Sequence, residues 1–314
     1  MKLENYEVHL PNYSIGDKIY QNIGPVCESY GKTVLVIGGK KALDAVKCLC
    51  ITDDKPVFTF PTIASNCSAC TSVSIMYHEN GSFLRPNFFV RPAMHAFIDT
   101  EIIAKAPSQY MWAGIGDTYA KYYEAAISSR DEELEHFTAL GTSISKMCCD
   151  PLLKYAPKAF SDHKKGLCTY DVEQVVLAII VTTGIASIFL TKDFTPDYNS
   201  GLAHAIFYAL TNYPVIEEKH LHGEVVGFGV LLALLVDQQE EEFEKIYQLN
   251  CTINLPVSLE QIDISQDQWE ESINRIPQMS DLAHYPYTVT KEMLTDAMNR
   301  LRERVRKDVD DAEE

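Results

Sequence analysis

The sequence has no apolar run long enough for a transmembrane helix. Its longest apolar stretch, residues 175–190 (VVLAIIVTTGIASIFL), also contains Thr and Gly. A spanning helix needs roughly 20 predominantly apolar residues. We therefore interpret this stretch as a buried core helix. The Met1 end carries no signal-peptide pattern, so we expect a cytoplasmic protein with no membrane partner.

Basic residues are also scarce. The chain has 27 Lys and Arg residues against 44 Asp and Glu residues, which gives a formal net charge of −17. Binding to a nucleic-acid backbone depends on clustered Lys and Arg, so this charge argues against a nucleic-acid partner. An anionic cofactor would need local donors, such as glycine-rich backbone, helix N-termini or a few lysines.

The nine cysteines do not form the pattern of a structural zinc site. Two close pairs are present, Cys48/Cys50 and Cys67/Cys70, but no second pair stands at the spacing of a zinc ribbon. Without a signal peptide, we expect the cysteines to be reduced thiols in a cytoplasm.

The N-terminal part has the pattern of a parallel α/β sheet. A short strand-like piece and a weakly amphipathic helix over 15–30 come first. Residues 32–39 (KTVLVIGG) form a β-branched run that ends in two glycines, a helix follows over 40–50, and residues 56–61 (PVFTFP) resemble a second buried strand. Strands buried on both faces read as continuous apolar runs, so these segments predict one βαβ unit.

A hairpin follows, and then a long helical part. Residues 62–77 predict a loop of small residues running into a strand, and the Asn-Gly pair in 78–82 (HENGS) predicts a turn into residues 83–90. The length allows two domains, and we place them at 1–105 (α/β) and 106–314 (all-α). Apolar periodicity predicts helices over residues 100–106, 117–128, 131–156, 171–191, 201–212, 223–249, 267–274 and 290–308.

Three side chains suggest a metal site. His204 lies in one apolar helix pattern, His222 begins the next, and Asp117 is a glycine-flanked acid at the start of another. Two imidazoles and a carboxylate suit a divalent transition metal such as zinc or ferrous iron. Each residue also has a simpler interpretation. Asp117 could be a helix N-cap, His204 a hydrogen-bonded core histidine, and His222 a solvated loop residue.

Several segments together resemble the iron-containing alcohol dehydrogenase superfamily in its glycerol dehydrogenase-like branch. They are GGKKALDAVK, FPTIASNCSACTSVSIMY, HENGSF, AGIGDTYAKYYEA, GLAHAIFYAL and HLHGEVVGFG. Hydroxycarboxylate dehydrogenases of that branch are the most similar, through APSQYMWAGIGDTYAKYYEA and HYPYTVTKEMLTDAM. The resemblance implies the dehydroquinate synthase-like fold of this superfamily, in which a Rossmann-like α/β domain precedes an all-helical domain.

The resemblance implies that Asp117, His204 and His222 are the metal ligands and carry the catalysis. Such an ion would act as a Lewis acid on the substrate oxygen while hydride passes to or from the nicotinamide of NAD(H) or NADP(H). Some members have another histidine one turn after Asp117, where this chain has Lys121, and another three residues after His204, where it has Phe207.

The same resemblance implies a set of cofactor and substrate positions. The glycine motif and its helix would meet the pyrophosphate, and the loop and strand that follow would line the nicotinamide and its ribose. These cofactor positions are Gly38, Gly39, Lys40, Asp44, Thr62, Thr71, Val73 and Tyr77. Cys67 stands where glycerol-oxidising members have an aspartate. A neutral thiol would not repel an anionic 2-hydroxy or 2-oxo acid, so it favours acids over glycerol; alternatively, Cys67 is simply a small buried residue.

The chain departs from the family in its nucleotide domain. Family members run through a further helix, strands and turns between the first strand and a second glycine motif, whereas this chain has one such motif. Roughly two units of about 30 residues are therefore expected to be absent. Lys40 replaces the third glycine, so its side chain would stand where backbone approaches phosphate.

The expected function is a metal-dependent dehydrogenase. It would transfer hydride between a nicotinamide dinucleotide and a small 2-hydroxy or 2-oxo acid, or a vicinal alcohol such as glycerol. The alternative is a catalytically impaired relative that keeps the metal site but has lost dinucleotide binding. A hydrolase-like or lyase-like site is a third hypothesis, and no nucleophile–base pair near the ligands supports it. A shortened sheet exposes apolar strand edges, so we also expect a homo-oligomer.

Overall fold

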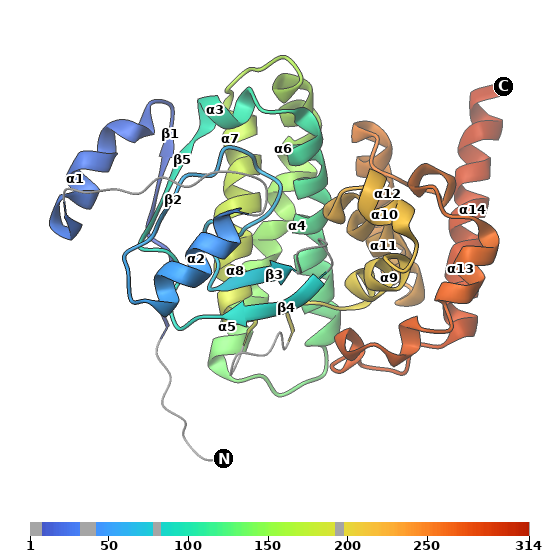
Figure 1. Cartoon of the computed structure of the whole chain (residues 1–314). Helices are drawn as coiled ribbons and strands as arrows, with labels where there is room; N and C mark the ends of the chain where they lie inside the picture. The colour runs from blue at the N-terminus through green and yellow to red at the C-terminus, as the bar shows by residue number, and fades with distance from the viewer. Residues whose placement is uncertain (1–7, 32–41, 78–82, 192–197, 314) are drawn as a thin grey trace.

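The strands of the first sheet come from distant parts of the chain. The computed structural model describes residues 8–31, 42–77, 83–191 and 198–313. In these ranges β1 (Tyr13–Gly16), β5 (His95–Asp99) and β2 (Phe58–Thr59) form a parallel sheet in the order β1-β5-β2 (Figure 1). The central strand is thus the last in sequence, which requires crossover connections on both sides.

The described residues include only part of the expected βαβ unit. The predicted strand over 32–39, together with Gly38, Gly39 and Lys40, lies outside the described residues. The strand predicted over 56–61 is shortened to the two residues of β2. β5 was not predicted, because five residues without flanking turn signals give no clear periodicity. Its register is instead set by tertiary contacts, such as the stacking of Phe97 on Phe60 at 5.1 Å.

The predicted hairpin is confirmed. β3 (Val73–Tyr77) pairs in antiparallel fashion with β4 (Phe83–Phe88), and the expected turn over 78–82 lies outside the described residues. Helix α2 (Ala42–Thr52) packs against β3 (Figure 1). The helix predicted over 15–30 starts later, at Ile19, because Ile15 belongs to β1.

The remaining described elements are helical. They are η1 (Ile19–Asn22), α1 (Ile23–Cys27), η2 (Glu28–Tyr30), α3 (Thr100–Ala104), α4 (Ser108–Ser128), α5 (His136–Ser145), η3 (Lys146–Cys148), α6 (Asp150–His163), α7 (Tyr170–Val176), η4 (Leu177–Thr182), α8 (Thr183–Phe189), α9 (Leu202–Leu210), α10 (Pro214–Lys219), α11 (His222–Val236), α12 (Glu240–Ile253), η5 (Glu260–Ile262), α13 (Gln266–Ser272), η6 (Ile276–Gln278), η7 (Ser280–Leu282) and α14 (Lys291–Glu313).

The helical pattern was predicted well in type but less well in its boundaries. Helix α4 begins at Ser108 rather than at Asp117, so Asp117 lies in the helix interior and the N-cap interpretation is wrong. The predicted helix over 131–156 is divided between α5 and α6, and that over 223–249 between α11 and α12. The second break falls at Gln238, whose φ of 59° is left-handed and ends the α-helical path.

Helix α11 lies at the centre of the helical part. It is apolar on all sides, and all of its residues after His222 are buried. A helix of this kind must be surrounded by other elements, and α4, α9, α12 and α14 pack around it (Figure 1). The helical stretch Tyr170–Phe189 is long and apolar enough to cross a membrane by length and composition, but 67% of its most apolar window is buried inside the protein.

Asp237 ties the end of α11 to the end of α4. Its side chain is 1% exposed. It accepts two hydrogen bonds from Arg130 (2.6 and 2.8 Å), one from the Tyr287 hydroxyl (2.7 Å) and one from Gln239 (2.6 Å). Burial alone would raise the pKa of Asp237, but these hydrogen bonds bring it below its ordinary value. The carboxylate is therefore held in its ionised form.

We expect Asp237→Asn to lower the free energy of unfolding at pH 7 by about 2–3 kcal/mol, because Arg130 and Tyr287 lose a charged acceptor. A depressed native pKa stabilises the fold above the unfolded pKa of about 3.9, and this contribution is lost as the pH falls through the native pKa. Urea unfolding at pH 7 and at about pH 3 should therefore show a smaller difference between variant and wild type in acid. An equal difference at both pH values would contradict this assignment.

Candidate metal centre

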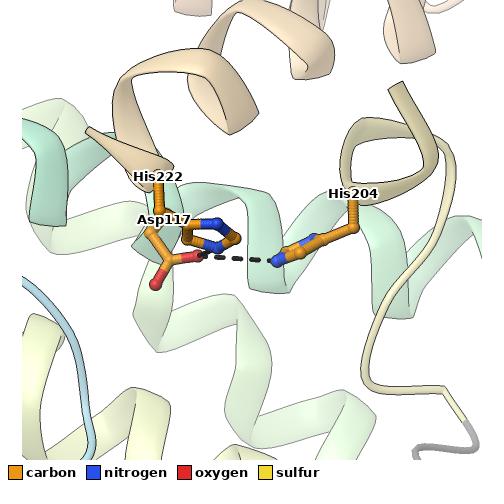
Figure 2. A group of neighbouring side chains, drawn as sticks. All are labelled: Asp117, His204 and His222. Atoms are coloured by element: carbon orange, nitrogen blue, oxygen red, sulfur yellow. Dashed lines mark ion pairs between the residues drawn. The ribbon is translucent and has the colours of Figure 1, made fainter. Parts of the chain in front are cut away.

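Three helices bring the predicted ligands together. Asp117 projects from the middle of α4, His204 from the first turn of α9, and His222 is the first residue of α11. Figure 2 shows the three side chains pointing toward one another across the gap between these helices. Residues that are 87 and 105 positions from Asp117 in sequence (204 − 117 and 222 − 117) therefore meet at one place.

Glycines allow this convergence, because they let the helix backbones approach closely. A Cβ on Gly116 of α4 would lie 2.1 Å from the carbonyl oxygen of Gly223 of α11. A Cβ on Gly223 would lie 2.0 Å from the carbonyl oxygen of Ala113. On the next turns of α11, a Cβ on Gly229 would lie 2.8 Å from the carbonyl oxygen of Ala203 in α9. Any side chain at these contacts would push the ligand-bearing helices apart.

The distances between the potential ligand atoms suit a single ion. Oδ1 of Asp117 lies 3.6 Å from Nε2 of His204 and 3.4 Å from Nε2 of His222. The three atoms all lie within 4.8 Å of one another. Bonds of about 2.0–2.2 Å to a tetrahedral ion put neighbouring ligand atoms about 3.3–3.6 Å apart. The donor set and its spacing therefore fit a divalent metal of the zinc or ferrous type.

The charges of Asp117 and His204 offset each other within this group. Burial alone would raise the pKa of Asp117, but the imidazoles of His204 and His222, at 3.6 and 3.4 Å, bring it well below its ordinary value. Burial alone would lower the pKa of His204, but the carboxylates of Glu124 and Asp117 raise it to about 10. A protonated imidazole therefore balances the carboxylate in the metal-free protein, and metal ions compete with protons for such ligands.

The group is open on one side. The side chains of Asp117 and His204 are 15% and 10% exposed, whereas that of His222 is 43% exposed. The Phe207 ring packs edge-on against His222, with ring centroids 4.4 Å apart. Three protein ligands beside an accessible face are the arrangement of a catalytic metal site, since a structural site is closed by a fourth protein ligand.

Cys67 lies near this group. Burial, and then the charge of Asp117, raise the pKa of its thiol to about 12. The thiol is therefore neutral at physiological pH, and it adds no negative charge beside Asp117.

The predicted cofactor residues that the structure describes lie on α2, on the loop after β2 and on β3. Asp44 is in the first turn of α2 and accepts a hydrogen bond from the Ser68 hydroxyl at 2.5 Å. Thr62 is in the following loop, and Val73 and Tyr77 are the ends of β3. The buried hydroxyl of Thr71 donates to the carbonyl oxygen of Val73 at 3.2 Å.

A buried lysine joins these elements. Nζ of Lys47 donates to the carbonyl oxygen of Ser68 (2.7 Å) and to the hydroxyl of Thr71 (3.3 Å), and it lies 3.6 Å from Asp44. Its side chain is completely buried, and burial lowers its pKa despite the nearby Asp44. Lys47 thus anchors the loop that carries Cys67 to helix α2. The hydroxyls of Ser72 and Ser74 are buried without a hydrogen-bond partner among the described residues, so this segment keeps free polar groups.

Sequence reasoning missed Glu124, which contacts His204 directly at 2.6 Å. Its place seven residues after Asp117 is a possible signal, because positions i and i+7 share one face of a helix. It also missed the helix contacts of Gly116 and Gly223, although both glycines lie beside predicted ligands. Glycine often marks a close approach of two helices, but the sequence around it does not show which helix is the partner.

Known proteins with similar sequences are dehydrogenases of the family that the sequence motifs resemble. The chain is 32% identical over 259 residues to the glycerol dehydrogenase of Thermotoga maritima, covering 79% of this chain and 67% of that protein. It is 31% identical over 273 residues to hydroxycarboxylate dehydrogenase A of Escherichia coli K12, covering 85% and 74%. The chain belongs to the glycerol dehydrogenase-like branch of the iron-containing alcohol dehydrogenase superfamily. No family model matches it.

Solved structures of this superfamily share the fold. A probable glycerol dehydrogenase from Sinorhizobium meliloti 1021 superposes with a TM-score of 0.80 at 22% identity, covering 96% of this chain and 99% of that one. An iron-containing alcohol dehydrogenase from Thermotoga maritima superposes with a TM-score of 0.61 at 16% identity, covering 95% and 99%. These likenesses confirm the predicted fold class, an α/β part followed by a helical part.

The match does not extend over the whole of every relative. The chain spans 64% of the length of the glycerol dehydrogenase of Pseudomonas putida, compared with 67% and 74% for the two relatives above.

Proposed function

We propose that this chain is a metal-dependent oxidoreductase that transfers hydride between a nicotinamide dinucleotide and a small hydroxy compound. Membership of the glycerol dehydrogenase-like branch supports the reaction class. The observation that carries the proposal is the convergence of Asp117, His204 and His222 within 4.8 Å on the open side of three packed helices. We also propose the domain division at 105/106, which comes after the last strand, β5, and the short helix α3.

Asp117, His204 and His222 would hold the ion. When bound, the ion would supply Lewis acidity at the substrate oxygen, and NAD(H) or NADP(H) would supply or accept the hydride. The carboxylate would offset the charge of the ion, and the two imidazoles would fix its position. A zinc or ferrous ion fits this oxygen–nitrogen donor set.

The proposed substrate is a small 2-hydroxy or 2-oxo acid, in preference to glycerol. The neutral thiol of Cys67 supports this choice, because a carboxylate at that place would repel an anionic substrate. Asp117 already supplies one negative charge to the region, so a second would weaken acid binding further. The similarity to hydroxycarboxylate dehydrogenase A points in the same direction.

The cofactor would lie along the path from Asp44 to Tyr77, with the pyrophosphate beside Gly38, Gly39 and Lys40. The hydrogen bonds of Lys47 to Ser68 and Thr71 support this placement, since they hold the loop and strand that carry these positions against α2. The second candidate is an impaired relative that holds the metal but not the dinucleotide. The single glycine motif favours it, because a Rossmann-like site normally grips both halves of the cofactor.

Two measurements on the purified protein test these proposals. Elemental analysis after dialysis should find one equivalent of zinc or iron, and NADH titration should give saturable energy transfer from Trp112 and Trp269. The loaded protein should then reduce 2-oxobutyrate. Failure to retain either metal would overturn the metal-dependent proposal. Metal retention without NADH binding at millimolar cofactor would instead establish the impaired relative.

We further propose a cytoplasmic homo-oligomer. Large apolar side chains are exposed on and beside the short strands, including Tyr13 (42%), Phe60 (36%) and Leu84 (45%). Apolar groups at strand edges favour association with another subunit. Light scattering coupled to size-exclusion chromatography would test this, and a monomer at micromolar concentration would contradict it.

A further inference from the structure

We propose that Glu124 is a positioning residue that fixes the ring orientation and tautomer of His204, so that Nε2 is presented to the metal. This inference rests on the metal site proposed above. Glu124 is 2% exposed and lies in α4, two helical turns after Asp117. One helix therefore supplies a metal ligand and the carboxylate that holds the second ligand in place.

The hydrogen bonds of Glu124 determine which nitrogen of the His204 ring carries the hydrogen. Its Oε1 accepts from the backbone N–H groups of Gly201 and His204, both at 2.9 Å. Its Oε2 lies 2.6 Å from Nδ1 of His204. An ionised carboxylate has only acceptor sites, so Nδ1 must carry the hydrogen in this contact. In the neutral ring, the lone pair is then on Nε2, the atom that faces Asp117 at 3.6 Å.

Glu124 also caps the helix that carries His204. Helix α9 begins after Gly201, which offers no side chain, and His204 is its third residue. An N-cap side chain normally accepts from the N–H of that third position, and here Oε1 of Glu124 does so from a different helix. A Cβ on Gly201 would lie 3.2 Å from both Cβ and Cγ of Glu124, so the absence of a side chain leaves room for the carboxylate.

Lys121 lies between Asp117 and Glu124 on the same face of α4 and holds the segment that leads into α9. Its Nζ donates to the side-chain oxygen of Asn199 at 2.7 Å and to the Asn199 carbonyl oxygen. Asn199 in turn donates to the Ser187 hydroxyl at 3.1 Å. Lys121 thus holds the segment before α9, while Glu124 holds its first turn and the imidazole. The contacts of Lys121 with Asn199 and of Glu124 with His204 together hold the imidazole of His204 in place.

The variant Glu124→Gln separates positioning from capping. The amide oxygen of Gln can still accept from the N–H groups of Gly201 and His204. Its NH₂ group would then face Nδ1 of His204 and favour a lone pair there, which moves the hydrogen to Nε2. Loss of such a partner typically weakens metal affinity by about 10–100-fold. We expect this weakening for zinc, measured by competition with a chromophoric chelator, with little change in far-UV circular dichroism.

Glu242→Gln is the matched control. Glu242 accepts from the Tyr123 hydroxyl at 2.7 Å, so this change also removes the charge of a carboxylate bound to α4, but on the side facing α12. It should bind zinc as the wild type does, and Glu124→Asp should recover part of the lost affinity. Wild-type affinity in Glu124→Gln, or equal losses in both Gln variants, would overturn the positioning role. Wild-type protein that binds no zinc would instead refute the metal site itself.

A measurement on the zinc-loaded wild-type protein tests the tautomer without any variant. Long-range ¹H–¹⁵N spectra of protein labelled at histidine should show the His204 hydrogen on Nδ1, with Nε2 bearing the shift of a metal-bound nitrogen. A hydrogen on Nε2 would overturn the inference, even if the Gln variant failed to fold.

Discussion

Asp117→Asn should abolish stable metal binding and hydride transfer while leaving the fold intact. The carboxylate is the one anionic ligand of the group and lies 3.4–3.6 Å from both imidazoles. An amide keeps the shape but not the charge, so nothing offsets the charge of the ion. Because loss of an outer-shell partner alone costs about 10–100-fold, loss of this ligand should weaken zinc affinity by more than about 100-fold.

The readout is thermal unfolding with and without zinc. A ligand present at 100 times its dissociation constant stabilises the native state by about 2.7 kcal/mol, so zinc should raise the Tm of the wild type but not of Asp117→Asn. Asp296→Asn removes a carboxylate that is 71% exposed in α14 and should respond to zinc as the wild type does. A zinc-dependent Tm shift in Asp117→Asn equal to that of the wild type would exclude Asp117 as a ligand.

Gly223→Ala should be among the most destabilising single-methyl substitutions in this chain. The new Cβ would lie 2.0 Å from the carbonyl oxygen of Ala113 and 2.9 Å from Cβ of Asp117. Carbon and oxygen atoms do not approach so closely, so α4 and α11 would have to separate by roughly 1 Å or more. Overpacking typically costs about 1–3 kcal/mol. Because the obstacle is backbone, we expect at least about 3 kcal/mol, or roughly 6–12 °C in Tm.

The same substitution should also weaken zinc binding, because Asp117 and His222 lie beside the displaced contact. Gly24→Ala is the matched control. Gly24 lies in α1 with nothing within 4 Å of an added Cβ, so the new methyl group meets no obstacle. Because Pro25 follows and disfavours helical backbone at a residue with a Cβ, we expect a small loss of stability, well below that of Gly223→Ala. If Gly223→Ala unfolded at the wild-type temperature, the close contact between α4 and α11 would be wrong.

Elements with their own periodicity or turn signal could be predicted from the sequence, whereas elements set by tertiary contacts could not. The hairpin of β3 and β4 and the buried helix that contains residues 175–189 were predicted, because each has its own periodicity or turn signal. Strand β5 was missed, and the start of α4 was placed nine residues too late (117 − 108). The glycines of AGIG come directly before the predicted start of this helix. They lie within the helix because a neighbouring backbone occupies the space that side chains would take.

Asp117, His204 and His222 could be named from the sequence because their segments resemble those of a known family. The resemblance gave residue types and order, but not what holds the residues in place. The interior position of Asp117, the contact of Gly223 with Ala113 and the cap that Glu124 provides to α9 came only from the structure.

The sequence by itself determined the acidic surface, the helical character of most of the chain and the identity of the candidate ligands. These properties depend on composition, on periodicity within one segment, or on motifs that stay contiguous. Tertiary structure alone decided that three distant segments share one ion-sized space, and which carboxylate supports which imidazole. The physical reason is that contacts between residues 80 or more positions apart, such as Glu124 with His204, depend on how whole helices pack, and no short stretch of sequence records that packing.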